Sequence, residues 1–155
     1  MSQEIEDIVK KAHELFMKFG IKSVSMDDIA RELGVSKKTL YQHVSDKNEL
    51  VIMVVDYESR CLGEKWNKAN FADMNAIEEM IALQKQVVEI QSNKNHSVEF
   101  DLKKYYPAVF KELIEMHRAR IYESSLENML KGKKEGLYRD NLNAKAIAML
   151  MVSRA

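Results

Sequence analysis

Apolar side chains recur every three to four residues through most of this chain, which is the period of an amphipathic α-helix. The first such stretch covers residues 4–19 and is followed by Gly20, a residue that often terminates helices. Its apolar positions are Ile5, Ile8, Val9, Ala12, Leu15, Phe16 and Phe19. We expect this helix to support the elements that follow it.

Residues 25–50 contain two shorter apolar patterns separated by a glycine. Ser25 is a suitable N-cap, because its hydroxyl can accept a hydrogen bond from an amide of the first helical turn. Gly34 is expected to take the left-handed conformation that ends a helix, and Ser36 to cap a second helix whose Leu40 faces the core. The apolar stripe of the first of these helices consists of Met26, Ile29, Ala30 and Leu33.

Three positions in this stretch favour a helix-turn-helix unit. Ala30 is small enough for a second helix to cross close by, Gly34 permits a sharp turn, and Leu40 anchors the second helix. The second helix leaves polar side chains outside, and such side chains can reach base edges or phosphates when the helix lies in a DNA major groove. These side chains are Lys37, Lys38, Thr39, Tyr41, Gln42 and His43.

The run SMDDIARELGVSKKTLYQHVSDKNEL, preceded by LFMKFGIKSVS, closely resembles the DNA-binding domain of TetR/AcrR-type bacterial transcriptional regulators. The resemblance is dense over residues 5–55. It implies a DNA-binding domain at residues 1–46, followed by a helical effector-binding and dimerisation domain at residues 47–155. It implies that Lys47 contacts a DNA phosphate, and family members commonly carry LYxHF where this chain ends the motif with Val44. The full set of DNA contacts implied is Ser36, Lys37, Lys38, Thr39, Tyr41, Gln42, His43 and Lys47.

Further apolar periods predict helices over residues 47–68 and 77–91 and a helix of at least six turns that begins near Pro107 and frays around Gly132 and Gly136. The polar run SNKNHS is expected to end the second of these, and residues 100–106 form a short aromatic segment. Asn141 or Asn143 can cap a final helix. Because the family resemblance implies two long C-terminal helices that pair with a partner's two, we expect the body to be incomplete at its carboxyl end.

Composition agrees with an all-α fold, since the chain has five Gly, one Pro and 46% hydrophobic residues. One Cys excludes an internal disulfide, and a single thiol suits a reducing compartment. The first residues, MSQEIEDIVKKA, are charged and do not resemble a signal peptide, and no apolar run approaches the length of a membrane helix. We therefore expect a cytoplasmic protein with no membrane partner.

The charge balance of the chain limits how it could bind DNA. Lys and Arg number 24, as do Asp and Glu, so the chain has no overall basic excess that would attract it to nucleic acid. Residues 36–47 hold three basic groups and one acidic group, which gives a small positive edge. The amino termini of helices near Met26, Lys37 and Lys47 can add backbone amides as phosphate donors. The pattern predicts sequence-directed contact rather than indiscriminate binding.

Signals for catalysis and for metal binding are weak in the sequence. It has no glycine-rich phosphate loop and no Cys-x-x-Cys pair, and its four histidines share no metal-ligand spacing with one another or with Cys61. Cys61 lies on an apolar helical face and is expected to be a buried thiol. We therefore predict neither an enzyme nor a cofactor.

Aromatic and methionine side chains are abundant near the predicted helix ends of the body. Such residues usually fill a core, but a surplus at helix ends can also enclose a small molecule. The family resemblance implies an effector of unspecified class in this region. The residues expected to line such a pocket are Trp66, Phe71, Met74, Tyr105, Tyr106, Phe110 and His117.

The leading hypothesis is a ligand-responsive DNA-binding regulator, most often a repressor in this family. As a homodimer it would place two reading helices in successive major grooves, about 34–36 Å apart, on a pseudopalindromic site. An effector would change that spacing by shifting the population between two packings. Two alternatives remain, a helical protein-interaction module and a small-molecule-binding protein, and both predict no DNA binding.

Overall fold

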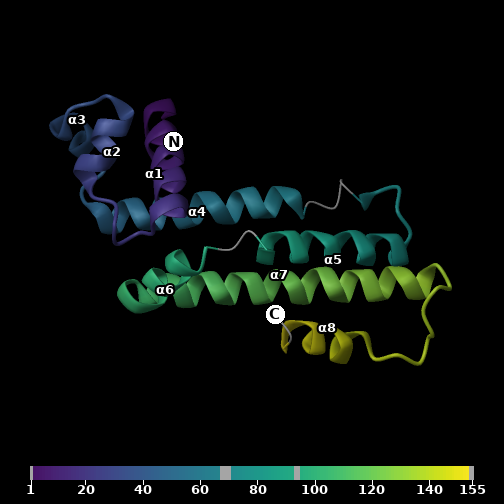
Figure 1. Cartoon of the computed structure of the whole chain (residues 1–155). Coiled ribbons are helices and arrows are strands. Elements are labelled where there is room, and N and C mark those ends of the chain that lie inside the picture. Colours follow the sequence, from purple (N-terminus) through teal and green to yellow (C-terminus); the bar gives the residue numbers. More distant parts are fainter. Residues whose placement is uncertain (1, 67–70, 93–94, 154–155) are drawn as a thin grey trace. The chain divides into compact units, whose positions relative to one another are not determined.

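The computed structural model describes residues 2–66, 71–92 and 95–153 (Figure 1). In this part of the chain all regular elements are helices, as the sequence predicts, and none is both long and apolar enough to cross a membrane. The helices are α1 (Gln3–Phe19), α2 (Met26–Leu33), α3 (Lys37–His43), α4 (Lys47–Lys65), α5 (Ala76–Ser92), α6 (His96–Tyr105), α7 (Pro107–Lys134) and α8 (Ala144–Ser153).

The chain divides into two compact units. The first contains residues 1–64 and 95–111, and the second contains residues 65–94 and 112–155. Helix α7 therefore begins in the first unit and continues in the second. Helix α4 up to Glu64 and the distant helix α6 belong to the unit that contains α1 to α3.

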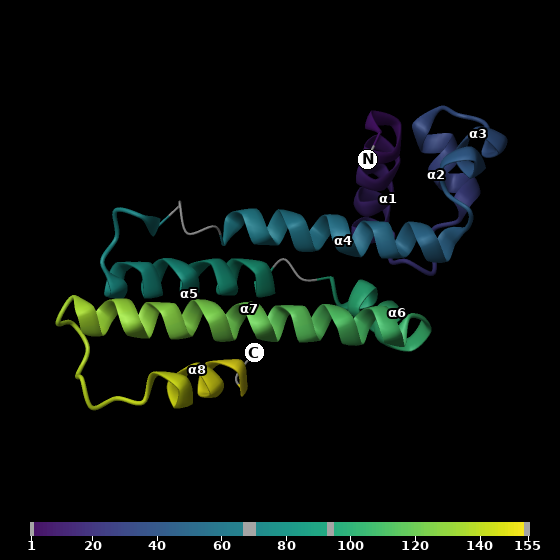
Figure 2. The same cartoon turned by 180° about the vertical axis from the view of Figure 1, so that it is seen from behind.

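In the first unit, α1, α2 and α3 gather at the beginning of α4 (Figures 1 and 2). Each of these helices contributes apolar side chains to one core, but Phe19, which the sequence placed in the apolar stripe of α1, is 52% exposed. Burial of this apolar area is the main stabilising contribution to the unit. The core side chains are Ile8, Val9, Ala12, Phe16, Ile21, Val24, Met26, Ile29, Ala30, Leu40, Val44, Leu50, Val51, Val54 and Leu102.

Side chains cap the helix starts of this unit, including the predicted cap at Ser25. The Ser25 hydroxyl accepts a hydrogen bond from the Asp28 amide, and the Asp28 carboxylate accepts one from the Ser25 amide, which completes a capping box. At the start of α4, the Asp46 carboxylate accepts from the Glu49 amide. The Glu49 carboxylate accepts from the Ser45 amide, one residue earlier than in a regular capping box. These bonds satisfy amides that a helix start would otherwise leave without partners.

Helix α6 was not predicted. The polar run SNKNHS was interpreted as the end of one helix, but Asn95 within it is the N-cap of another, and its side chain accepts from the amides of Ser97 and Val98. The same Asn95 side chain donates to the Met17 carbonyl of α1 at 2.5 Å. A polar run can thus be a helix start when one of its members caps the next turn.

In the second unit, α5 and α8 lie on opposite sides of α7 (Figures 1 and 2). The start of α5 is held by a fully buried polar group, Asn128 of α7, whose amide nitrogen donates to the Ala76 carbonyl at 2.9 Å. The Tyr138 hydroxyl is 3.0 Å from the Asn128 side-chain oxygen and 3.2 Å from the same carbonyl. Glu135 accepts from the Ala76 amide at 2.7 Å. At the start of α8, Asn143 is the cap rather than Asn141.

Of the two glycines predicted to mark the end of α7, Gly132 lies inside the helix and Gly136 lies just beyond it. Gly132 lies in α7 and is buried, and a Cβ atom added there would overlap the ring of Tyr138. The helix ends further along, after Lys134, where Gly136 has a φ of 71°. Gly132 is therefore a packing glycine: it lets the Tyr138 ring lie directly on the helix backbone.

This packing predicts the effect of Gly132→Ala. The Tyr138 ring cannot swing away without losing its two hydrogen bonds, so the extra methyl group should lower the free energy of unfolding of this unit by about 1–3 kcal/mol. Denaturant unfolding followed by the fluorescence of Trp66, the single tryptophan, measures the change. In a Tyr138→Ala background the sign should reverse, because alanine is the better helix former by about 1 kcal/mol. A loss in both backgrounds would contradict the proposed overlap.

Candidate nucleic-acid interface

Helix α3 exposes the side chains that the sequence assigned to DNA contact. Leu40 is fully buried, whereas Lys37, Lys38, Tyr41 and Gln42 are exposed. Thr39 and His43 are half-buried. The polar side of this helix is turned to solvent, as expected for a helix that reads DNA.

The turn before α3 sets its direction. Gly34 has φ 69° and ψ 23°, the left-handed conformation that the sequence predicted, and its amide hydrogen-bonds to carbonyls at the end of α2. Ser36 then caps α3 by accepting from the Thr39 amide at 3.0 Å. Its hydroxyl also lies 2.8 Å from the Thr39 hydroxyl, so both side chains are tied to each other at the helix start.

Three lysines face one hollow of about 310 Å³ in the first unit. Lys37 makes an ion pair with Asp27 of α2, with 2.7 Å between Nζ and Oδ1, and this carboxylate raises the pKa of Lys37. Lys22 donates from Nζ to the Tyr105 hydroxyl at 2.9 Å. The hollow is lined by Lys22, Ser23, Val24, Ser25, Met26, Asp27, Lys37, Tyr41 and Lys47.

Lys47, which the resemblance assigned to a phosphate, has an internal partner. Its ammonium donates to the Ile21 carbonyl at 2.6 Å and lies 6.0 Å from the centroid of the Phe16 ring. Burial lowers the pKa of Lys47, and the nearby carboxylates of Asp101 and Asp28 oppose that change. Lys47 therefore connects the start of α4 to the turn between α1 and α2.

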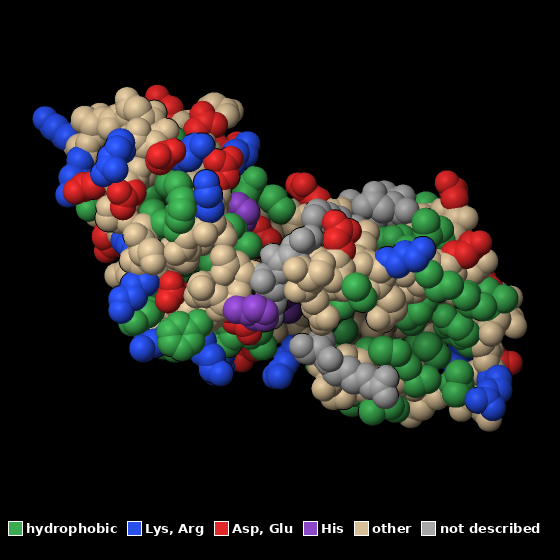
Figure 3. Space-filling view, in the orientation of Figure 1, with side chains coloured by type: hydrophobic (Ala, Val, Ile, Leu, Met, Phe, Trp, Pro, Cys, Tyr) green, Lys and Arg blue, Asp and Glu red, His purple; other side chains and the backbone are tan. Residues whose placement is uncertain are grey.

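Charge on this surface is mixed. His43 lies 3.9 Å from the Glu4 carboxylate, and Arg31 pairs with Asp28 at 3.2 Å. Lys38 has no ion pair with any residue that the structure describes. Figure 3 shows basic and acidic side chains interspersed over α1 to α3 rather than a continuous basic patch. The positive edge counted from the sequence is thus partly neutralised by acidic residues of α1 and α2.

The sequence did not reveal that α6 holds the turn in front of α2. The Asp101 carboxylate, which is buried, accepts from the Lys22 amide at 2.8 Å. The Lys22 ammonium lies 4.9 Å from the centroid of the Tyr105 ring, and its proximity lowers the pKa of the Tyr105 hydroxyl. No local signal identifies these contacts, because Lys22 and Asp101 are 79 residues apart.

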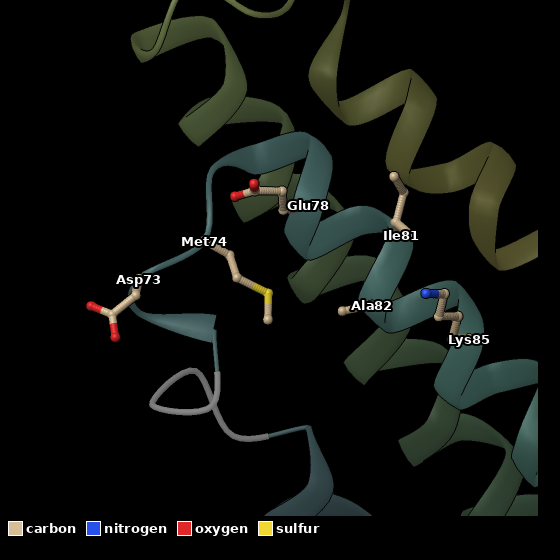
Figure 4. Close-up of a pocket in the computed structure, with 6 residues that line it drawn as sticks. All are labelled: Asp73, Met74, Glu78, Ile81, Ala82 and Lys85. Carbon is tan, nitrogen blue, oxygen red and sulfur yellow. The ribbon is translucent and has the colours of Figure 1, made fainter.

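The residues predicted to line an effector pocket fall into both compact units. Tyr105, Tyr106 and Phe110 belong to the first unit, and Tyr105 is exposed. Trp66, Phe71, Met74 and His117 belong to the second, and Phe71 is buried. An open hollow of about 510 Å³ in the second unit includes only Met74 from this set. Figure 4 shows its lining residues, which are Asp73, Met74, Glu78, Ile81, Ala82 and Lys85.

Side chains with reactive or metal-binding potential are dispersed. Among the described residues, no group of three His, Cys, Asp or Glu side chains is placed to hold a metal ion. Cys61 was expected to be buried but is half-exposed. A hydrogen bond with Cys61 raises the pKa of Tyr57, and the Tyr57 ring packs edge-on against His13, which pairs with Glu58 at 2.6 Å.

Comparison with known proteins places the helix-turn-helix region in a sequence family. Residues 8–54 match the family described as bacterial regulatory proteins, tetR family. HTH-type transcriptional regulators of Staphylococcus aureus, from strains bovine RF122 / ET3-1 and USA300, are 45% identical over 53 residues. That match covers 34% of this chain and 27% of each relative. The chain thus spans about a quarter of the length of these relatives.

Solved structures are similar over nearly the whole chain. A transcriptional regulator of the TetR/AcrR family from Thermobifida fusca superimposes with a TM-score of 0.72 at 19% identity, covering 98% of this chain and 81% of that one. The fatty acid degradation regulator FadR from Bacillus halodurans gives 0.67 at 13% identity, with 99% and 80% covered. The ketosteroid transcriptional regulator KstR2 of Mycobacterium tuberculosis gives 0.63 at 16%, with 97% and 79% covered. These likenesses show the fold.

The geometry of the turn predicts different effects for two substitutions of Gly34. No atom lies within 4 Å of an added Cβ, so Gly34→Ala should destabilise α2 and α3 by about 1–2 kcal/mol through the left-handed backbone alone. Gly34→Asn should lose less, because asparagine adopts this conformation more readily. Hydrogen exchange of the α2 and α3 amides measures both. Equal losses in the two variants would contradict a purely conformational cause.

Proposed function

We propose that this chain, whose residues 8–54 form a domain of the tetR family of bacterial regulatory proteins, is a transcriptional regulator that binds double-stranded DNA. The observation that carries the proposal is the outward polar face of α3. Tyr41 and Gln42 are exposed on it while Leu40 is fully buried beneath it. Side chains of this kind on a protruding helix can reach base edges and phosphates in the major groove.

The contacts divide by role. Thr39, Tyr41, Gln42 and His43 are proposed to face the bases, because they can donate, accept or make apolar contact there. Lys37, Lys38 and Ser36 at the start of α3 are proposed to contact phosphates, which position the helix without reading sequence. Lys47 can contact a phosphate only if its hydrogen bond to the Ile21 carbonyl breaks. Lys38 is the cation that needs no such rearrangement.

A homodimer is proposed as the binding species. The second unit carries exposed apolar side chains, and Figure 3 shows several gathered on its visible face. A hydrophobic surface of this kind supports contact with a second copy or with a further helix of the same fold. The exposed side chains are Ile77, Ile81, Val88, Met116, Leu130, Leu137, Met149 and Leu150.

A small-molecule effector that changes DNA affinity is proposed for the second unit, and repression is proposed as the regulatory outcome. The open hollow beside Met74 and Ile81 is lined by both apolar and charged side chains, the mixture that an apolar ligand with one polar group would require. One structural neighbour is named a ketosteroid transcriptional regulator, and another is named a fatty acid degradation regulator. Apolar metabolites with one acidic or ketone group are therefore the first class to test by thermal shift.

Selection of bound duplexes from a random DNA pool tests the activity. The expected result is enrichment of a two-part site whose halves lie about 34–36 Å apart, one helical turn of DNA. Affinity for the selected duplex should fall steeply with salt, because each neutralised phosphate contributes about −0.9 to the slope of log K against log salt. Recovery of no enriched sequence would favour an interaction module or a small-molecule-binding protein.

Replacing two reading side chains tests the assigned surface. Tyr41→Ala combined with Gln42→Ala should weaken binding to the selected site by roughly 30-fold or more, since each of two good base contacts contributes about 1–3 kcal/mol. Random duplex binding should change little, which fluorescence anisotropy on both duplexes would measure. Lys18→Ala, at an exposed position of α1, is the control and should leave selective binding intact. Full selectivity in the double variant would refute the assignment.

A further inference from the structure

The ion pair between Asp27 and Lys37 lies on the surface proposed to meet DNA. Asp27 belongs to the first turn of α2 and Lys37 to the first turn of α3, and 2.7 Å separates Oδ1 from Nζ. Both side chains are 57% exposed, so the pair is open to solvent and to a ligand. Asp27 and Lys37 also line the same hollow as Tyr41 of the reading helix.

Asp27 is not required to build α2. Capping of this helix is carried out by Ser25 and Asp28, which exchange hydrogen bonds. An exposed ion pair contributes little to stability, because both partners are well hydrated and lose side-chain freedom on pairing. The Asp27 carboxylate therefore matters mainly because it changes how readily Lys37 can bind an anion such as a phosphate.

The other two lysines of the hollow are already engaged with uncharged groups. Lys47 donates to the Ile21 carbonyl and Lys22 to the Tyr105 hydroxyl. Lys37 differs from them because its ammonium is paired with the carboxylate of Asp27, which also lines the hollow. A phosphate that approaches Lys37 must displace the Asp27 carboxylate and then lie beside it, which is unfavourable for two like charges.

We propose that Asp27 limits the sequence-independent affinity of this protein for DNA, by occupying Lys37 and repelling phosphates at the reading surface. This inference rests on the proposed DNA-binding function. It assigns to Asp27 a role in setting affinity, without any contact to a base. It also explains why the surface proposed to bind DNA has only a weak positive potential, in a chain with no net charge.

Asp27→Asn tests the proposal, since asparagine keeps the shape of the side chain and removes its charge. The affinity for random duplex DNA at about 0.1 M salt should rise roughly three- to tenfold, and the salt slope should steepen by up to about 0.9, the contribution of one phosphate contact. Affinity for a selected site should rise by the same factor, because phosphate contacts carry no sequence information. Fluorescence anisotropy over a salt series measures all three quantities.

Glu14→Gln is the matched control. Glu14 pairs with Lys11 on α1 at 2.7 Å, so this variant makes the same change in net charge and also breaks an exposed ion pair, but Glu14 does not line the hollow. Its effect on affinity should be clearly smaller than that of Asp27→Asn. An equal effect would show that only net charge matters and would overturn the proposal.

A double-mutant cycle with Lys37→Ala separates the pair from a general field effect. If Asp27 acts through Lys37, the gain from Asp27→Asn should shrink in the Lys37→Ala background. If Asp27→Asn raises duplex affinity by the same factor in the Lys37→Ala background, or does not raise it in the wild-type background, the proposal about Asp27 is overturned. Selective DNA binding by the wild type would still support the proposed function. Absence of any duplex binding by the wild type and by Asp27→Asn would overturn both.

Discussion

The burial of Leu40 is the interaction on which the candidate interface depends. Helix α3 has 7 residues, and an isolated helix of that length does not persist in water. Leu40 is 0% exposed and Val44, directly after the helix, is 1% exposed. Burying one such side chain contributes about 1.5–3 kcal/mol, more than the roughly 1 kcal/mol of a single N-cap. Tertiary packing therefore holds α3, and its remaining positions are free to be polar.

Local chemistry explains why the helix-turn-helix could be predicted so fully from the sequence. The Ser25 and Ser36 caps bond to amides three residues away, and the left-handed Gly34 satisfies carbonyls of the turn it ends. Each of these features is complete within a few residues, so a pattern in the sequence is enough to identify it. The periods of α1, α4, α5 and α7 were visible for the same reason.

Contacts between distant residues leave no comparable local pattern in the sequence. The sequence names Lys47 and Asp101 as charged residues, but it does not indicate that Lys47 bonds to a carbonyl 26 residues earlier or that Asp101 accepts from an amide 79 residues earlier. The role of Asn95 was missed because the residue acts both as a cap of α6 and as a donor to α1. The candidate pocket residues are mostly aromatic, and side-chain type does not determine which compact unit a residue joins.

The charge of the candidate interface also depends on contacts between residues that are distant in the sequence. A count over residues 36–47 gives three basic groups and one acidic group, yet Lys37 is paired with Asp27 and Lys47 is directed into the protein. The effective positive field is thus weaker than the composition of α3 indicates, because a neighbouring element supplies the opposing charge. Under the proposed DNA-binding function, a helix with so little net field must derive most of its sequence preference from the fit of its side chains to base edges. Orientation of α3 by its buried leucine then matters more to recognition than the number of lysines it carries.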